Sequence, residues 1–497
     1  MLERINGFLW GVPVLGLILG TGLWLGLRTG FVQVRMLGQA MREFLRRMRD
    51  RDSGFRALCT ALAATVGTGN IAGVAGAIAI GGPGAVFWMW VSGFLGMGVK
   101  YAEGVLAVRY REKDGRAGPM YIIRNALGGR WRWAAGIYAL FGLLAAFGVG
   151  NATQVNAVMM ALKGAGAGNG FAAWVGIGLA AIAVVMVSGG AKRLTRAAEA
   201  VVPVVSGAYM LLCVVALWLG RGAIPGALTA ILRGAWDPEA VTGGMVGSAA
   251  LALRIGVSRG TFTNEAGMGT AAIAHAQACV GHPAQQGLMG IMEVFLDTIV
   301  ICTLTALAIL VSGVSIPYGK DVGAVLTTRA FAAVYGDFAS IALGVILSCF
   351  AFATVLGWGL YGARCAEYLF GSRSWKVFAL AQTAMVIAGA VADTASVWAL
   401  SETVNGLMAI PNLITLALLS NEVTRLTIEY RKSGRKAGGG TYANFHQCKP
   451  LRTLSYEKVP PSGCGSQERG QENLPSEHRP ARSAHPRGLL RGHPQVR

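Results

Sequence analysis

The sequence contains few charged residues. Asp, Glu, Lys and Arg together make up 14% of its 497 residues, whereas ordinary soluble domains contain about 25%. Hydrophobic residues account for 54%, and the mean hydropathy is +0.51. The composition therefore argues against a soluble globular protein and indicates an all-α polytopic membrane protein embedded in a lipid bilayer.

Acidic residues are the scarcer of the two charged classes. There are 24 Asp and Glu against 44 Lys and Arg, so the formal net charge is +20. In a soluble protein such an excess would suggest nucleic-acid binding. Here the basic residues lie mainly between long apolar segments and near the C-terminal end. Membrane topology explains that distribution better, and we expect no nucleic-acid partner.

The sequence also lacks the short motifs of several enzyme classes. Its eight cysteines are scattered, without metal-binding or redox spacing, and we expect no disulfides. No HExxH zinc motif, nucleophile elbow or nucleotide-binding loop stands in a convincing context. An intramembrane hydrolase is therefore disfavoured, ATP-driven transport would need a separate partner, and we expect that the chain is not an enzyme.

Long apolar runs dominate what is present. About 20 apolar residues suffice to cross the hydrocarbon core as a helix. We identify about eleven candidate spans, at residues 8–27, 56–80, 84–107, 133–155, 171–189, 200–220, 240–275, 287–312, 338–362, 374–393 and 395–420. Residues 31–50, between the first two spans, mix apolar residues with arginines, which predicts an amphipathic helix on the cytoplasmic membrane surface.

Basic residues alternate between the two sides of these spans. Arginine-rich loops follow the first span and occupy 109–132, and later basic clusters near 192–196, 364–376 and 425–432 fall on the same side. The loops on the opposite side hold few. Because cytoplasmic loops are enriched in Lys and Arg, we expect a multi-pass protein of the cytoplasmic (inner) membrane. Its N-terminus would lie outside and its C-terminus in the cytoplasm.

One span contains a predicted break. The middle of Thr60–Gly82 reads VGTGN at residues 66–70, where each Gly lowers helix propensity by about 1 kcal/mol. Unwound backbone is tolerated in a membrane only where it is buried in protein or lines a watery cavity. The N–H and C=O groups released here would be able to hold an ion or a zwitterion. The alternative is a glycine-rich packing face that lets helices approach closely.

A second interrupted segment favours the first of these alternatives. Gly256–Ala276 is nearly apolar but contains Gly and polar residues, and paired interruptions in two halves indicate a transporter's midplane site. With the first span set aside, each break lies in the first span of a group of five. Because each group has an odd number of spans, the two groups have opposite orientations in the membrane. We therefore expect a five-plus-five inverted repeat; a channel would not need two converging breaks.

Composition divides the chain into three regions. Residues 1–54 hold the extra N-terminal span and the basic amphipathic segment. Residues 55–432 are expected to form the transporter core, with one repeat at 55–220 and the other at 240–420. Residues 433–497 are rich in Gly, Pro, Ser, Arg and His. They cannot bury a core, and we expect a disordered cytoplasmic tail.

Four motifs carry a resemblance to a known family. They are GTGNIAG at 67–73, GVGNATQVN at 148–156, SRGTFTNEAGMGTAAIAHA at 258–276 and FAFATVLGWGLYG at 350–362. Together they resemble the alanine-or-glycine:cation symporter family. The resemblance implies a LeuT-type fold and a secondary active transporter that imports alanine and/or glycine by alternating access, with sodium as the co-transported ion. The alternative is proton-coupled import, with Glu265 or Asp297 titrating.

A zwitterionic amino acid needs a partner for each of its charges. The helix that restarts after the first break points its N-terminus, with free N–H groups and the positive end of its dipole, into the cavity. We assign the substrate carboxylate to Thr68, Gly69 and Asn70. Unwound carbonyls around Thr263–Gly267 would accept from the amino group. The resemblance implies that the substrate lies at these same two breaks.

The resemblance also implies a sodium site. Sodium is a hard cation that takes oxygen ligands, and by position these would be carbonyls near Ala63 and Val66 and the hydroxyl of Thr354. Related sequences usually have a hydroxyl residue directly before this threonine, whereas this chain has Ala353. One oxygen ligand would then be missing, and we expect rather low sodium affinity.

Three large side chains are further candidate substrate contacts. The resemblance implies such a contact for Gln154, against the alternative of interhelical hydrogen bonding, which is common for amides in membranes. Trp358 lies one helical turn from Thr354 and is expected to form a wall of the cavity. Phe262 is expected to act as a gate. Simple packing is the alternative for both aromatic residues.

Several charged residues fall inside the spans, where carboxylates are costly and usually functional or paired. For Glu265 we favour an ion pair with Arg259 or Arg254 over a proton-carrying role. Lys100 is expected to pair with Glu103, three residues later on the same helix face. The carboxylates left unassigned are Glu293, Asp297 and Glu402.

Overall fold

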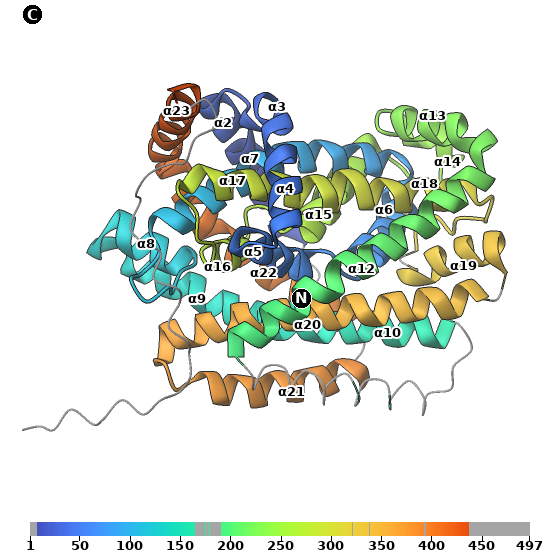
Figure 1. The fold of residues 1–497 in the computed structure, drawn as a ribbon. Coiled ribbons are helices and arrows are strands. Elements are labelled where there is room, and N and C mark those ends of the chain that lie inside the picture. The colour runs from blue at the N-terminus through green and yellow to red at the C-terminus, as the bar shows by residue number, and fades with distance from the viewer. Residues whose placement is uncertain are drawn as a thin grey trace, which may run out of the picture. The chain divides into compact units, whose positions relative to one another are not determined.

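The computed structural model describes residues 7–164, 174, 178, 190–320, 322–336, 338–391 and 394–436. Over these residues the chain forms helices and no strands (Figure 1), which confirms the predicted all-α class. The predicted span at 171–189 lies almost entirely outside the described residues, as does the predicted tail beyond residue 436.

The helices follow one another closely along the chain. Up to the second break they are α2 (Val12–Thr29), α3 (Val32–Arg35), α4 (Leu37–Asp50), α5 (Ser53–Thr65), α6 (Val74–Gly81), α7 (Gly84–Arg109), α8 (Pro119–Leu127), α9 (Arg132–Phe147), α10 (Thr153–Gly164), α12 (Gly190–Leu219), α13 (Ile224–Gly234), α14 (Pro238–Thr242) and α15 (Ala249–Asn264). Beyond it they are α16 (Thr270–His275), α17 (Pro283–Val294), α18 (Thr303–Val311), α19 (Ala324–Tyr335), α20 (Phe338–Phe370), α21 (Trp375–Val391), α22 (Thr394–Leu418) and α23 (Ser420–Lys436). The amphipathic helix predicted for 31–50 corresponds to α3 and α4.

Three π-helical turns stand between these helices. They are η1 (Gly69–Gly73), η3 (Gly148–Ala152) and η5 (Phe295–Cys302). Such turns widen the helix locally and occur often at functional sites. The first leads into α6, the second joins α9 to α10, and the third joins α17 to α18.

The lengths of the described helices bear on the predicted count of eleven membrane spans. Six helices in the described residues are long and apolar enough to cross a membrane, and two bent pairs of helices pass the same test. The predicted span at 240–275 is divided among α14, α15 and α16, and α21 has only 17 residues. None of these four helices reaches the length of about 20 residues that a straight span needs. The count of eleven is therefore not confirmed.

The first predicted break is present. Helix α5 ends at Thr65, and the chain restarts in η1 and α6 at an angle of 52° to α5. At the end of α5 the backbone of Val66 turns extended, with φ −77° and ψ 95°. The residues that carry the break, Gly67 and Thr68, are buried. Because their backbone is buried, its polar groups need partners from protein or ligand.

The second predicted break is also present, between α15 and α16. Gly267 and Gly269 have φ of 91° and 78°, a left-handed region that glycine enters at little cost. Glu265 has φ of 52°, and an L residue with a side chain there costs on the order of 1 kcal/mol. A strained carboxylate at a membrane break marks this turn as a place to look for function.

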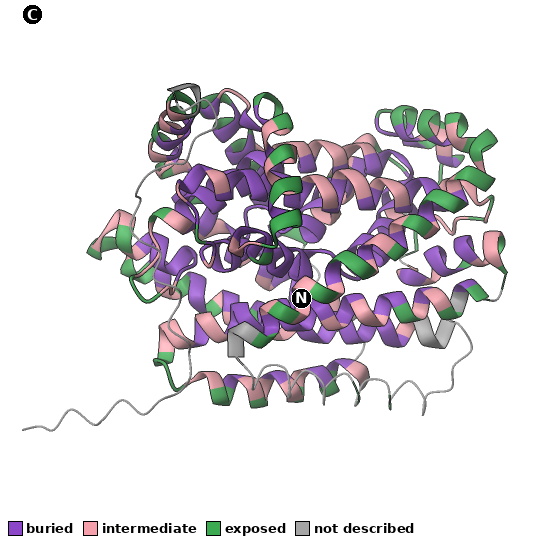
Figure 2. Ribbon diagram, viewed as in Figure 1, coloured by how far each residue is buried: buried purple, intermediate pink, exposed green. Residues whose placement is uncertain are grey.

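The outer helices present apolar side chains to their surroundings. Trp218 on α12 and Leu380 on α21 are 69% and 74% exposed. In Figure 2 the helices α5, α16 and α17 are almost wholly buried, whereas α12 and α21 alternate between exposed and buried positions. Large exposed apolar surfaces of this kind fit lipid rather than water.

Glycines bring α7 against both α15 and α17. A Cβ atom at Gly256 of α15 would lie 2.3 Å from the carbonyl oxygen of Ala85, and one at Gly290 of α17 would lie 2.6 Å from that of Lys100. Only glycine allows backbones to approach so closely. Helix α7 is thereby held next to the second break, and its own polar side chains can reach it.

Candidate functional site

The first break is held open by a side chain of its own segment. Asn70 is fully buried, and its Oδ1 accepts the N–H of Gly67 at 2.9 Å. In a continuous helix that N–H would bond to the carbonyl of Ala63, four residues earlier. Likewise, the N–H of Asn70 donates to the carbonyl of Gly67 at 3.3 Å instead of to Val66. The break therefore frees the carbonyls of Ala63 and Val66 from their helical donors.

Thr354 of α20 lies directly beside this break. A Cβ atom at Gly67 would be 2.5 Å from Thr354 Oγ1. The Thr354 hydroxyl is buried and has no hydrogen-bond partner in the described part of the chain. Ala353, also buried, offers no side-chain oxygen. Thr354 thus stands next to the break that follows Ala63 and Val66 at the end of α5.

Gln154 connects the first break to α10. The hydroxyl of Thr68 donates to Gln154 Oε1 at 2.8 Å, and Gln154 Nε2 donates to the carbonyl of Val149 in η3 at 3.0 Å. Gln154 Oε1 would also lie 3.3 Å from a Cβ atom at Gly67. The side chain is therefore interhelical, as the packing alternative supposed, and also adjacent to the candidate substrate site.

The two breaks meet at Gly69. A Cβ atom there would lie 3.4 Å from Thr263 Cγ2 and 3.6 Å from Phe262 Cδ1. The ring of Phe262 packs against Trp398 of α22, with 5.4 Å between the ring centroids. Residues from both breaks, which are almost 200 positions apart in the sequence, thus share one small space. One methyl group at Gly69 fits at van der Waals distance.

The second break is held open from outside by Glu103 of α7. Its Oε1 accepts the N–H groups of Gly267 and Gly269 at 3.0 and 3.1 Å, and Asn412 Nδ2 of α22 at 2.9 Å. Asn412 also donates to the Gly267 carbonyl at 2.9 Å. In a helix the Gly267 N–H would bond to the carbonyl of Thr263, which this break therefore frees. Gly267 itself, a predicted substrate residue, has both backbone polar groups occupied by protein.

Trp358 is tied to the second break. It is fully buried, and its Nε1 donates to Glu265 Oε1 at 2.9 Å. On its other side it packs on η3, since a Cβ atom at Gly150 would lie 2.3 Å from the Cβ of Trp358. The hydroxyl of Thr270 donates to Glu265 Oε2 at 2.6 Å. The position of the Trp358 ring is therefore set by a specific hydrogen bond as well as by packing.

The expected ion pair of Glu265 with an arginine is wrong. Arg259 pairs instead with Glu402 of α22, at 2.9 Å. Neither Arg259 nor Arg254 pairs with Glu265 in the described chain. The reason is helical geometry, because Arg259 stands six residues before Glu265, roughly two-thirds of a turn around the axis. The αL backbone of Glu265 then turns its carboxylate toward α16 and α20, as the bonds from Thr270 and Trp358 show.

Lys100 also has a different partner from the expected Glu103. Its Nζ donates to Glu293 Oε1 of α17 at 2.8 Å, and the other oxygen of Glu293 contacts His275 Nε2 at 2.8 Å. His275 Nδ1 in turn lies 2.7 Å from Gln286 Nε2. Buried charges need a partner with good geometry, and Glu293 supplies it across the glycine contact between α7 and α17.

Sequence reasoning missed a bridge between the two breaks. Asn70 Nδ2 donates to Asp297 Oδ1 at 2.7 Å, and Thr298 Oγ1 donates to Asp297 Oδ2 at 2.8 Å. Asn264 Nδ2 then donates to Thr298 Oγ1 at 3.0 Å. The π-helical turn η5 thus links residues of both breaks through one buried carboxylate. Its position inside an apolar span was the available signal, since such carboxylates usually have a function.

Comparison with known proteins shows the family. The model of the sodium:alanine symporter family matches residues 1–444. The sodium/alanine symporter AgcS of Methanococcus maripaludis is 40% identical over 455 residues, which cover 88% of this chain and 98% of that protein. An uncharacterized transporter of Haemophilus influenzae is 42% identical over 440 residues, covering 86% of this chain and 95% of the relative.

A third relative and a solved structure are also similar. The amino-acid carrier protein AlsT of Bacillus subtilis is 37% identical over 440 residues, which cover 87% of this chain and 92% of that protein. The crystal structure of MhsT in complex with L-phenylalanine matches with a TM-score of 0.53 at 14% identity, covering 76% of this chain and 98% of MhsT. The predicted LeuT-type fold is thereby confirmed.

Proposed function

The chain belongs to the sodium:alanine symporter family, and on that premise we propose that its two broken helices form one binding site for an amino acid and sodium. The chain is a sodium-coupled symporter of alanine, a transporter rather than an enzyme. The proton-coupled alternative is not favoured. We further propose that it imports alanine, and glycine as well, across the cytoplasmic membrane, with its N-terminus outside and its C-terminus in the cytoplasm.

The single observation that carries the proposed site is the release of backbone groups at both breaks. At the first, the N–H groups of Thr68 and Gly69 begin a restarted helix, where first-turn N–H groups lack intrahelical partners. The positive end of the helix dipole adds to their attraction for a carboxylate. We assign the substrate carboxylate to these groups, with Asn70 shaping the turn and Gln154 beside it.

The substrate amino group needs acceptors, and the second break supplies them. The Thr263 carbonyl has lost its helical donor to Glu103. The carbonyl of Gly267 already accepts from Asn412, so we place the ammonium nearer Thr263. Phe262 and Trp358 would then border the side of a small amino acid, Phe262 against Gly69 and Trp358 against Glu265.

Sodium, as the co-transported substrate, fits the end of α5. The carbonyls of Ala63 and Val66 are freed from their helical donors, and the Thr354 hydroxyl has no partner among the described residues. All three offer oxygen atoms, which suit a hard cation. An unpartnered buried hydroxyl is unfavourable without a ligand, so an ion there would satisfy it. Ala353 contributes no oxygen, which is why we expect a weak site.

The test is transport by purified protein in proteoliposomes. Labelled alanine and glycine should accumulate when sodium is high outside, and collapse of the sodium gradient should abolish accumulation. A pH gradient without sodium should drive none. Accumulation that follows the pH gradient and ignores sodium would overturn the sodium site, and failure of unlabelled glycine to compete would restrict the substrate to alanine.

A further inference from the structure

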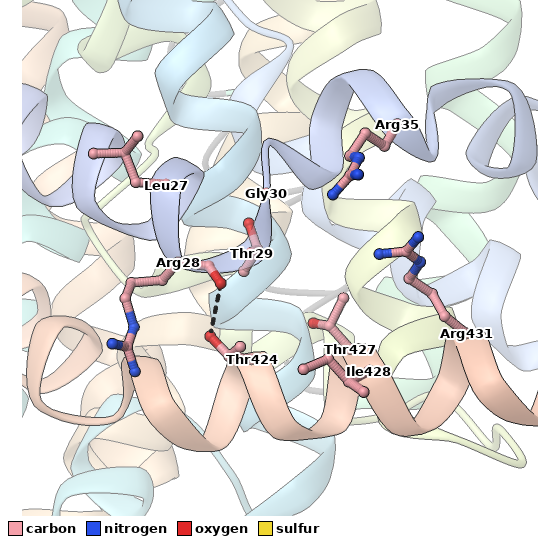
Figure 3. A pocket seen from close by; sticks show the side chains of 9 residues that line it. All are labelled: Leu27, Arg28, Thr29, Gly30, Arg35, Thr424, Thr427, Ile428 and Arg431. Carbon is pink, nitrogen blue, oxygen red and sulfur yellow. Dashed lines mark hydrogen bonds between the residues drawn. The ribbon is translucent and has the colours of Figure 1, made fainter.

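A pocket of about 250 Å³ lies between the end of α2 and the helix α23. Its lining comes from α2, α3 and α23 and contains none of the residues proposed above to hold amino acid or sodium. Figure 3 shows Arg35 and Arg431 extending into this space from α3 and from α23, with Thr424 and Thr427 between them and Arg28. The pocket is therefore basic and lined with hydroxyl groups.

Two of the three arginines that line this pocket, Arg35 and Arg431, have no counter-ion in the described chain. Arg35 and Arg431 are both exposed, and no ion pair reaches either. The guanidinium of Arg35 lies over the chain at Gly30, where a Cβ atom would be 2.5 Å from its Nη1. The nearby acid Glu422 is already bound by Arg425, at 2.7 Å. Two like charges that share a pocket raise its positive potential and favour an anion.

The pocket lies where two membrane helices end. Helix α2 ends at Thr29, and α22 gives way to α23 with a bend of 58°. Thr424 Oγ1 of α23 donates to the carbonyl of Arg28 at 3.2 Å, which joins the end of α2 directly to α23. Cationic side chains at the ends of spans lie at the depth of lipid headgroups.

An apolar surface leads away from the pocket along both helices. Leu23 and Leu27 are four residues apart on α2 and are 47% and 58% exposed. On α22, Ile414 and Leu418 repeat that spacing and are also exposed. Residues four apart lie on one face of a helix. A lipid whose phosphate lies in the pocket could pack its acyl chains on this apolar surface. Free phosphate has no apolar part that would contact it.

We propose that this pocket binds the headgroup of an anionic phospholipid, with Arg35 and Arg431 on the phosphate and acyl chains along Leu23 and Leu27. Guanidinium groups bind phosphate oxygens through paired hydrogen bonds. The lipid would join the corner after α2 to α23, two segments almost 400 positions apart. It would therefore stabilise the docking of α23 without contacting the transported substrate.

The test uses the full-length protein, purified in detergent and stripped of lipid. Its melting temperature is measured with added phosphatidylglycerol, with phosphatidylcholine and with inorganic phosphate. The pocket variant is R35Q/R431Q. The matched control is R42Q/K432Q, which removes two charges from the adjoining helix α4 and from α23, at exposed positions outside the pocket.

We expect phosphatidylglycerol to raise the melting temperature of the wild type and the control variant, and to bind R35Q/R431Q at least tenfold more weakly. The same shift with phosphatidylcholine would overturn the proposal, and so would equal losses in the two double variants. A full shift with inorganic phosphate alone would assign the pocket to a soluble phosphate and overturn the lipid.

A second variant covers the case in which R35Q/R431Q does not fold. R35K/R431K keeps both charges but loses the paired hydrogen bonds of the guanidinium. We expect it to remain monodisperse and to retain labelled phosphatidylglycerol through detergent washing, less well than the wild type and better than any charge-neutral variant. The background is the label that the wild type retains after treatment with excess unlabelled lipid. If R35K/R431K retains no more label than this background, the proposal is contradicted.

Discussion

The two breaks differ in the acceptor that binds the backbone N–H group exposed by each unwound turn. At the first, the acceptor is the amide oxygen of Asn70, a neutral group in the same segment. At the second, it is the carboxylate of Glu103, a charged group on another helix, which accepts three hydrogen bonds at once. The N–H group at the first break is thus accepted within its own segment, by an amide that also donates to Asp297, whereas the second break is fastened to α7 and α22.

This difference suggests a division of labour. A backbone N–H group held by one neutral acceptor can exchange that acceptor for a ligand at little cost, because such a bond contributes only about 1 kcal/mol net. A turn held by a buried carboxylate cannot, because removing either partner leaves buried polar groups unsatisfied. We therefore expect ligand binding to depend most on the first break, and the integrity of the fold to depend most on the second.

The largest expected effect is on stability, in the variant Glu103→Leu. It removes the acceptor of Gly267, Gly269 and Asn412, and each buried donor left unsatisfied costs about 1–3 kcal/mol. The expected total is a loss of several kcal/mol, which would appear as a greatly reduced yield of monodisperse protein and a much lower melting temperature.

The matched variant at the other break is Asn70→Ala. It removes one donor from the buried carboxylate of Asp297, which keeps its bond from Thr298, so it should lower the melting temperature less than Glu103→Leu does. It should remove alanine uptake, because it disturbs the turn that faces the ligand. Glu103→Gln, which keeps a carbonyl oxygen, should lie between the wild type and Glu103→Leu in stability. If Asn70→Ala proves as unstable as Glu103→Leu, the proposed contrast between the breaks is wrong.

The next effect concerns substrate binding at Gly69. A Cβ atom there reaches Thr263 and Phe262 at 3.4 and 3.6 Å, so Gly69→Ala should fold and bind alanine more weakly. Gly69→Val adds two further methyl groups in the space between the breaks and should abolish binding, a loss of more than 100-fold. Calorimetry of alanine binding to monodisperse protein measures both. Undiminished alanine affinity in Gly69→Val would place the substrate elsewhere.

A smaller effect is expected for the cation at Thr354. Thr354→Ala removes the one side-chain oxygen of the proposed sodium site and should raise the sodium concentration for half-maximal uptake at least tenfold, which corresponds to about 1.4 kcal/mol. Thr354→Ser keeps the hydroxyl and should preserve the wild-type sodium curve. Equal curves for the wild type and Thr354→Ala would show that sodium binds away from α20.

The sequence was sufficient to locate both breaks but not the groups that hold them. A local interruption is predicted by Gly67, Gly69 and Asn70, because the effect of these residues on a helix acts within a few positions. Glu103 lies more than 160 positions from Gly267, and only the packing of α7 on α15 and α17 brings them together. The same limit explains the wrong partners expected for Glu265 and Lys100, since local spacing cannot anticipate contacts between helices.

The smallest expected effect is on sodium dependence, in the variant Ala353→Ser. Ala353 stands directly before Thr354 on α20, where a serine would add a second hydroxyl, and its own side chain is buried. Ala353→Ser should therefore lower the sodium concentration for half-maximal alanine uptake by a few-fold. A serine inside a helix can instead bond to the carbonyl four residues earlier, which limits the gain.

Ala351→Ser, the same change at another buried position of α20, is the matched control and should leave the sodium curve unchanged. A shift of equal size in both serine variants would point to a general effect of α20 polarity, and no shift in Ala353→Ser would mean that the ion does not reach this side of Thr354.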